Sequence, residues 1–154
     1  MLQQLGECLH SILGQSLENW ELLAVDDNST DDSRKIAMNF ARLDNRIRLI
    51  EPTRPGLVPA LNQGLEAASS SLIARMDADD VMLPNRIELQ LHACKLNSTA
   101  LLGSNFERIP ADATAFYTQW ANSLSGKDLT LQQYREVTLI HPTWFWHCSV
   151  WEDV

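Results

Sequence analysis

Three carboxylates crowd into four positions at the end of a short apolar run. Residues 73–84 read IARMDADDVMLP, and Asp77, Asp79 and Asp80 have no basic residue between them. Side chains alternate along an extended chain, so Asp77 and Asp79 would face the same ligand. Hard divalent cations prefer such oxygens, and Mg²⁺ commonly joins one or two carboxylates to substrate phosphates. The spacing predicts a cation site at Asp77 and Asp79, whereas Asp80 could equally serve the N-terminus of the helix after it.

A second pair of acids, Asp26 and Asp27, follows the apolar run WELLAV and opens the stretch DDNSTDDS. These carboxylates could accept hydrogen bonds from a nucleobase or a ribose. Capping of the next helix explains Asn28, Ser29 and Thr30, because these residue types favour helix N-termini. Capping does not explain the two acids before them.

Other polar and aromatic residues near these clusters could each have a functional or a structural role. Three arginines flank the acids: Arg54, Arg75 and Arg86. Each could counter phosphate charge, or form a structural ion pair. His141, in the segment HPTWFW, could bind metal or phosphate, and a hydrogen-bonded structural role is the alternative. Trp144 and Trp146 could stack on a sugar, although packing in a core is the commoner use of such residues.

Strands and helices alternate along the chain. Apolar periodicity predicts helices over residues 2–13, 36–41, 57–68 and 87–96, with Pro84 suited to the first turn of the last one. Short apolar runs predict strands at residues 20–25 (buried), 46–50, 71–76, 100–104 and 137–140, and residues 110–126 are expected to be irregular. This alternation indicates an α/β domain with a largely parallel sheet. Ligands bind beyond the carboxyl ends of such strands, where both acidic clusters fall.

Bulk properties exclude several classes of protein. The 154 residues suffice for one domain, and the net charge of −8 argues against a nucleic-acid partner. An acidic chain that holds a phosphate ligand needs a cation or local arginines. No apolar stretch reaches the roughly 18–20 residues that a membrane helix requires. The three cysteines are odd in number and form no CxxC pair, so no disulfide framework or zinc site is indicated and a cytoplasmic location is the default.

Three quoted segments together resemble a known family: ECLHSILGQSLENWELLAVDDNSTDDS, PGLVPALNQGLEAASSSLIARMDADDVMLPNRIELQ and HPTWF. They are similar, over about residues 7–150, to the inverting glycosyltransferases of family 2, which have the GT-A (Rossmann-like) fold. FYTQWANSL before HPTWF looks closest to the N-acetylglucosaminyltransferase-like branch. The resemblance implies transfer of N-acetylglucosamine or another hexose from a UDP-sugar to a hydroxyl of a glycan, lipid or protein acceptor, with Mn²⁺ or Mg²⁺.

The resemblance also implies roles for single residues. Asp27, or its neighbour Asp26, matches the acid that contacts uracil. Asp77 matches the first acid of the DxD motif, near ribose and metal, and Asp79 matches the metal ligand that holds the diphosphate. Positions usual in the family with less definite roles are Asn62 and Arg75, and His141 is a further candidate for substrate binding.

Two departures from the family pattern set further expectations. The family opens with an apolar strand and a Pro-x-Tyr-Asn-like loop, whereas this chain starts inside the following helix. After the HPT segment the family continues to an acidic pair that supplies the general base, and Glu152-Asp153 is too close to His141 to be that pair. We therefore expect a single incomplete domain over residues 1–154, truncated at both ends, without its first strand or its base, and prone to self-association.

Three alternative functions stay open at this point. In a phospho-receiver domain an acid pair meets an acceptor Asp, which Asp26-Asp27 and DVMLP imitate, but here a helix precedes the acid-pair strand. A DxD phosphatase would use Asp77 as nucleophile, although its motif normally follows the first strand. The third alternative is a non-catalytic fragment that only binds nucleotide or a partner protein.

Overall fold

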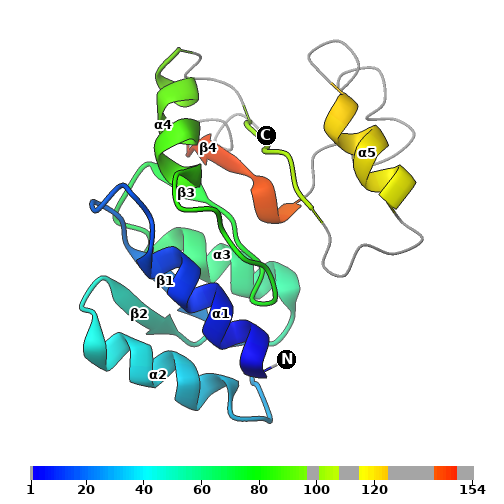
Figure 1. Cartoon of the computed structure of the whole chain (residues 1–154). Helices are drawn as coiled ribbons and strands as arrows, with labels where there is room; N and C mark the ends of the chain where they lie inside the picture. Colours follow the sequence, from blue (N-terminus) through cyan, green and yellow to red (C-terminus); the bar gives the residue numbers. More distant parts are fainter. Residues whose placement is uncertain (1, 97–100, 108–114, 125–140, 149–154) are drawn as a thin grey trace. The chain divides into compact units, whose positions relative to one another are not determined.

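The structure, a computed structural model, describes residues 2–96, 101–107, 115–124 and 141–148 (Figure 1). By contact it divides into two compact units, and each is described by itself. The first unit contains residues 1–71 and 78–88, and the second contains residues 72–77 and 89–154.

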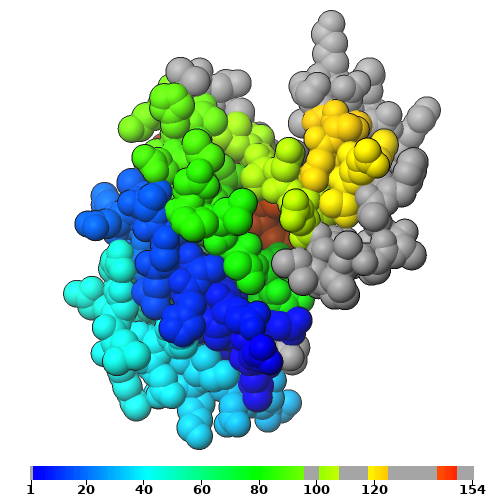
Figure 2. All heavy atoms as spheres, viewed as in Figure 1, coloured from blue at the N-terminus to red at the C-terminus, as the bar shows by residue number. Residues whose placement is uncertain are grey.

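The first unit contains a parallel pair of strands with helices packed on it. Its elements are α1 (Leu2–Leu13), β1 (Leu22–Val25), α2 (Ser33–Leu43), β2 (Ile47–Ile50) and α3 (Leu57–Ala67). Leu22 pairs with Ile47 and Val25 with Ile50, so α2 is the crossover that parallel pairing needs. α3 packs against β1, and α2 packs against β2 and α1. Figure 2 shows α1 in blue against α2 in cyan. His10 of α1 and Phe40 of α2 meet edge to face, with their ring centroids 5.0 Å apart.

The second unit is built on an antiparallel pair. Its elements are β3 (Leu72–Ala74), most of α4 (Arg86–Leu96), α5 (Ala115–Ser123), the 3-10 turn η1 (His141–Thr143) and β4 (Phe145–His147). Leu72 pairs with His147 and Ala74 with Phe145. Phe145, Trp146 and Cys94 are among its buried residues.

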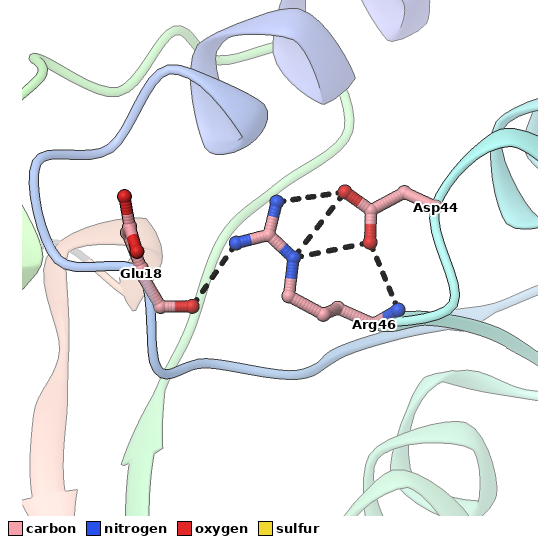
Figure 3. Close-up of polar contacts among 3 residues, drawn as sticks. All are labelled: Glu18, Asp44 and Arg46. Carbon is pink, nitrogen blue, oxygen red and sulfur yellow. Dashed lines mark hydrogen bonds and ion pairs between the residues drawn. The ribbon is translucent and has the colours of Figure 1, made fainter.

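An arginine clamp fixes the approach to β1 and β2 (Figure 3). The Arg46 guanidinium donates to both carboxylate oxygens of Asp44, at 2.7 Å for Nη2–Oδ2 and 3.0 Å for Nε–Oδ1, and to the Glu18 carbonyl at 3.0 Å. It also lies 3.8 Å above the ring of Trp20. Charge-assisted bidentate pairs hold their partners in one geometry. The clamp therefore joins the segment that enters β1 to the turn that enters β2.

The α/β prediction is confirmed, and several of its details are wrong. The strand predicted as buried at residues 20–25 is shorter, and all four residues of β1 are only partly buried. The strand predicted at 100–104 is reduced to a single bridge between Leu102 and Phe145. Pairing with β3 makes a strand of Phe145–His147, which the sequence did not indicate because its three residues do not alternate between apolar and polar.

Two helices also differ from prediction. α5 lies inside the region expected to be irregular. α4 begins at Arg86, so Pro84 precedes the helix and Asp80, six residues before its first residue, is too far away to cap it. Leu89, inside the helix predicted over residues 87–96, is 59% exposed. The strand predicted at residues 137–140 lies outside the described residues.

Candidate functional site

A buried glutamine at the end of α1 holds the segment that follows the acidic cluster. Gln15 Nε2 donates to the Leu83 carbonyl at 2.7 Å, and Gln15 Oε1 accepts from the backbone N–H of Ile87 at 3.1 Å. The side chain is 7% exposed. A buried amide with both ends bonded is costly to move, because displacement leaves polar groups unpaired. The segment is thereby fixed to α1 around both Leu83 and Ile87.

Two serines of the same region add to this attachment. Ser11 Oγ accepts from the backbone N–H of Met82 at 3.0 Å, and the Ser16 backbone N–H donates to the Pro84 carbonyl at 2.7 Å. These bonds begin three residues after Asp79. The first unit therefore offers Asp79 from a segment that is tied down immediately downstream.

The three carboxylates of the acidic cluster differ in their partners. Arg75 Nη2 donates to Asp77 Oδ1 at 3.2 Å. Burial lowers the pKa of the Arg86 guanidinium, and the negative charge of Asp80 acts in the opposite direction. Asp79 is exposed, and within the described part of the chain its carboxylate makes no hydrogen bond or ion pair. Of the three, Asp79 is thus the carboxylate without a cationic partner there.

The acids after β1 both bind backbone N–H groups of nearby loops. The Asp27 carboxylate oxygens both lie 2.9 Å from the backbone nitrogen of Gly56, the residue before α3. Asp26 Oδ1 accepts from the Ser29 backbone N–H at 3.1 Å, across a turn in which Asn28 has a φ of 58°. Gly56 has a φ of 115°, which residues other than glycine rarely adopt. Asp27 thereby ties the loop before α3 to the carboxyl end of β1.

The predicted helix cap is wrong in its residues. α2 begins at Ser33, too far along the chain for capping by Asn28, Ser29 or Thr30. Asp31 Oδ1 instead accepts from the Ser33 backbone N–H at 3.0 Å. Hydrogen bonds from the Ser33 side chain and from its backbone N–H lower the pKa of the Asp31 carboxyl.

The HPT turn is held from two sides within the second unit. Gln90 Nε2, on α4, donates to the Thr143 carbonyl at 2.8 Å, and the Arg75 backbone N–H donates to the Trp144 carbonyl at 2.8 Å. Trp146 is 7% exposed and meets Trp144 edge to face at 6.4 Å. Core packing, the commoner use of tryptophan, is therefore the role of Trp146.

The predicted site residues divide between the two units. Asp26, Asp27, Asn62 and Asp79 belong to the first unit, and Arg75, Asp77 and His141 belong to the second. Asn62 is exposed on α3, and Arg54 is exposed in the loop before it. His141 opens the 3-10 turn, but its side chain lies outside the described residues, as do Glu152 and Asp153.

The donors present fit a divalent cation shared with a phosphate ligand. Within the described ranges, no group of three or more His, Cys, Asp or Glu side chains could enclose a metal. A cation that keeps waters and binds through one or two carboxylates plus phosphate oxygens needs no such enclosure. Asp79, exposed and without a described partner, suits that arrangement. Asp77 is two residues earlier, so its Cα lies within about 7 Å of that of Asp79 by chain length alone.

Sequence reasoning missed Gln15 and Gln90. Gln15 follows the helix predicted over residues 2–13, and Gln90 lies within the helix predicted over residues 87–96. A polar residue at either place is normally expected to face solvent. Their role depends on backbone groups 68 and 53 residues away in sequence, at Leu83 and Thr143. No local pattern signals such a contact.

The sequence profile described as Glycosyl transferase family 2 matches residues 2–152. The chain belongs to glycosyltransferase family 2. This membership overturns the phospho-receiver and DxD phosphatase alternatives, whose resemblance was confined to short acidic motifs.

Curated relatives agree with the family. The putative glycosyltransferase EpsE of Bacillus subtilis (strain 168) is 44% identical over 89 residues, which are 56% of this chain and 32% of EpsE. An Escherichia coli protein, UDP-Glc:alpha-D-GlcNAc-diphosphoundecaprenol beta-1,3-glucosyltransferase WfgD, is 35% identical over 102 residues, which are 66% of this chain and 40% of WfgD. The chain therefore spans less than half the length of these two relatives.

Solved structures show the same fold. S. aureus TarS matches with a TM-score of 0.75 at 18% identity, over 98% of this chain and 27% of TarS. The mannosyltransferase PcManGT from Pyrobaculum calidifontis, in complex with GDP-Man and Mn²⁺, matches with a TM-score of 0.60 at 23% identity, over 70% of this chain and 33% of PcManGT. The GT-A fold predicted from the sequence is thereby confirmed. None of the helices in the described part of the chain has the length and apolar character needed to cross a membrane.

Proposed function

We propose that this chain takes part in the transfer of a hexose from a nucleotide-diphosphate sugar to an acceptor hydroxyl, with inversion and with a divalent cation. The observation that supports this most directly is that, in a chain of this family, Asp77 and Asp80 each have an arginine nearby whereas Asp79 has no described partner. Asp79 stands exposed without a described partner, on a segment that Ser11, Gln15 and Ser16 tie to α1. A carboxylate that is held in place and has no positively charged partner is suited to bind a cation.

The roles proposed for the residues follow from their chemistry. Asp79, with Asp77 two residues earlier, would hold Mn²⁺ or Mg²⁺. Such an ion supplies positive charge to the diphosphate as it leaves. Asp26 and Asp27 would read the nucleoside, since a carboxylate can accept about four hydrogen bonds and retains capacity beside its backbone partner. Asn62 and His141 are proposed as further substrate contacts on the resemblance alone.

The donor and the acceptor are proposed by analogy with relatives. WfgD is named for UDP-Glc and a diphosphoundecaprenol-linked acceptor, and PcManGT is in complex with GDP-Man and Mn²⁺. We propose a UDP-hexose as donor, with N-acetylglucosamine the sugar that the sequence resemblance favours. A sugar carried on a lipid or glycan is the acceptor class that follows.

Calorimetric titration of UDP with Mn²⁺, and again with chelator, tests the nucleotide and metal parts of the proposal. Binding should need Mn²⁺ and should weaken at least about tenfold in Asp79→Asn, which keeps the size but removes the charge that attracts the cation. Asp32→Asn is the matched control, because Asp32 is exposed and makes no capping bond through its side chain. Equal affinity with Mn²⁺ and with chelator would overturn the metal assignment.

Release of UDP from UDP-N-acetylglucosamine, UDP-glucose and UDP-galactose tests transfer itself. Release that depends on an added sugar acceptor supports a transferase. Metal-dependent UDP binding without any acceptor-dependent release would instead identify a module that only binds nucleotide.

A further inference from the structure

Within the second unit, the side chains of Arg75 and Asp77 form an ion pair of unequal burial. The Arg75 side chain is 15% exposed, whereas that of Asp77 is 40% exposed. The Arg75 side chain is thus the less exposed member of the pair. The carboxylate already occupies the guanidinium, which leaves fewer of its N–H groups for an incoming phosphate.

The ion pair joins two residues that are two apart in sequence, just after β3. Arg75 directly follows β3, and Asp77 lies two residues further along the chain. The Arg75 backbone is also fixed, since its N–H donates to the Trp144 carbonyl at 2.8 Å. The backbone of Arg75 is therefore attached to the residue before β4, and Arg75 Nη2 donates to Asp77 Oδ1 at 3.2 Å.

We propose that Arg75 is a positioning residue, which orients the Asp77 carboxylate for the metal-bound donor and tempers the negative charge that the cluster presents to a free cation. The inference rests on the proposed function. It assigns Arg75 to Asp77 rather than to a substrate phosphate. It also predicts that binding of the cation alone and binding of the donor respond to Arg75 in opposite directions.

Arg75→Gln should bind Mn²⁺ alone more tightly, by roughly two- to fivefold, because a partly exposed cation no longer opposes it. In saturating Mn²⁺ the same variant should bind UDP about threefold more weakly or worse, since Asp77 loses the donor that orients it. Titration of free Mn²⁺ by electron paramagnetic resonance gives the first affinity and calorimetry gives the second. A purely structural role for Arg75 would weaken both affinities and lower Tm, and that result would overturn the proposal.

Two further variants separate charge from geometry. Arg75→Lys keeps the charge and should leave the affinity for Mn²⁺ alone close to the wild-type value, while its single ammonium should restore UDP binding only in part. Arg34→Gln is the matched control, because it removes one positive charge from an exposed ion pair with Glu51. It should change neither affinity in the pattern expected for Arg75.

A double-mutant cycle decides whether Arg75 acts through Asp77. In the Asp77→Asn background, Arg75→Gln should change UDP affinity by less than about twofold, because its partner is already neutral. An undiminished effect in that background would mean that Arg75 contacts the donor directly and would overturn the proposal. Absence of metal-dependent UDP binding in the wild-type chain would instead overturn the proposed function, and this inference with it.

Discussion

Asp44 and Arg46 form an ion pair whose role is structural. Hydrogen bonds from Arg46 lower the pKa of the Asp44 carboxyl below its usual 3.8 and raise the pKa of the guanidinium. A carboxyl whose pKa is lower in the folded state contributes stability above its unfolded pKa, and this contribution is lost as the pH falls through the folded pKa.

Asp44→Asn should therefore lower Tm slightly at pH 7, and the difference from the wild-type chain should shrink as the pH falls below 3.8. Thermal unfolding followed by circular dichroism at a series of pH values measures both effects. Asp32→Asn removes the same charge without removing a capping bond, and its effect on Tm should not follow that pattern. A difference for Asp44→Asn that is unchanged at low pH would contradict a role for the ionised carboxylate.

At the residue scale, the sequence could predict which acids are chemically available but not how they are partnered. The spacing of Asp77 and Asp79 indicated a cation site, and their positions after a strand follow from local pattern. The partners of Asp27 and Asp79 depend on tertiary contacts: Gly56 is 29 residues from Asp27, and the absence of a described partner is what distinguishes Asp79.

α3 and β1 lie very close together at one glycine. A Cβ atom on Gly64 would lie 3.2 Å from Cγ2 of Val25, closer than ordinary van der Waals contact. Valine is branched at Cβ and has few alternative rotamers, so its methyl group cannot easily withdraw. Overpacking typically costs about 1–3 kcal/mol, whereas replacing a helical glycine by alanine gains about 1 kcal/mol.

Gly64→Ala should therefore reduce the free energy of unfolding by about 1 kcal/mol, the excess of overpacking over helix propensity. Chemical denaturation measures this change. In a Val25→Ala background the clash is absent, so Gly64→Ala should be neutral or stabilising there. A stabilising effect of Gly64→Ala in the wild-type background would show that the two elements can separate without cost.

Elements were predictable where a local pattern agrees with the tertiary fold. α1, α2 and α3 carry apolar residues at helical spacing, β1 and β2 lie in short apolar runs, and all five were found near their predicted positions. Phe145–His147 was not, because it becomes a strand only through its pairing with β3. α5 was not predicted either, because the apolar residues of the surrounding stretch show no continuous helical periodicity.

Two properties of the whole chain oppose one another in solution. Its net charge of −8 repels other copies, and that repulsion is screened over about 8 Å at physiological ionic strength. Against this, β1 has one edge without a partner strand in the described part of the chain. The N–H groups of Leu22 and Asp26 donate to the carbonyls of Arg46, just before β2, and of Ile50, so in a parallel ladder those of Leu23 and Val25 point to the other edge. Such an edge can pair with another chain.

Self-association should therefore increase with salt, from monomer at about 0.01 M to a concentration-dependent oligomer at about 0.15 M, as the repulsion is screened. Sedimentation velocity at several protein concentrations measures it. Leu23→Pro should suppress the oligomer, because proline removes the outward N–H and leaves the bonds of Leu22 and Asp26 to β2 in place. Leu23→Ala loses the same side chain but keeps the N–H, so it should still associate. A monomer at every salt and protein concentration would mean that this edge of β1 is covered within the chain itself.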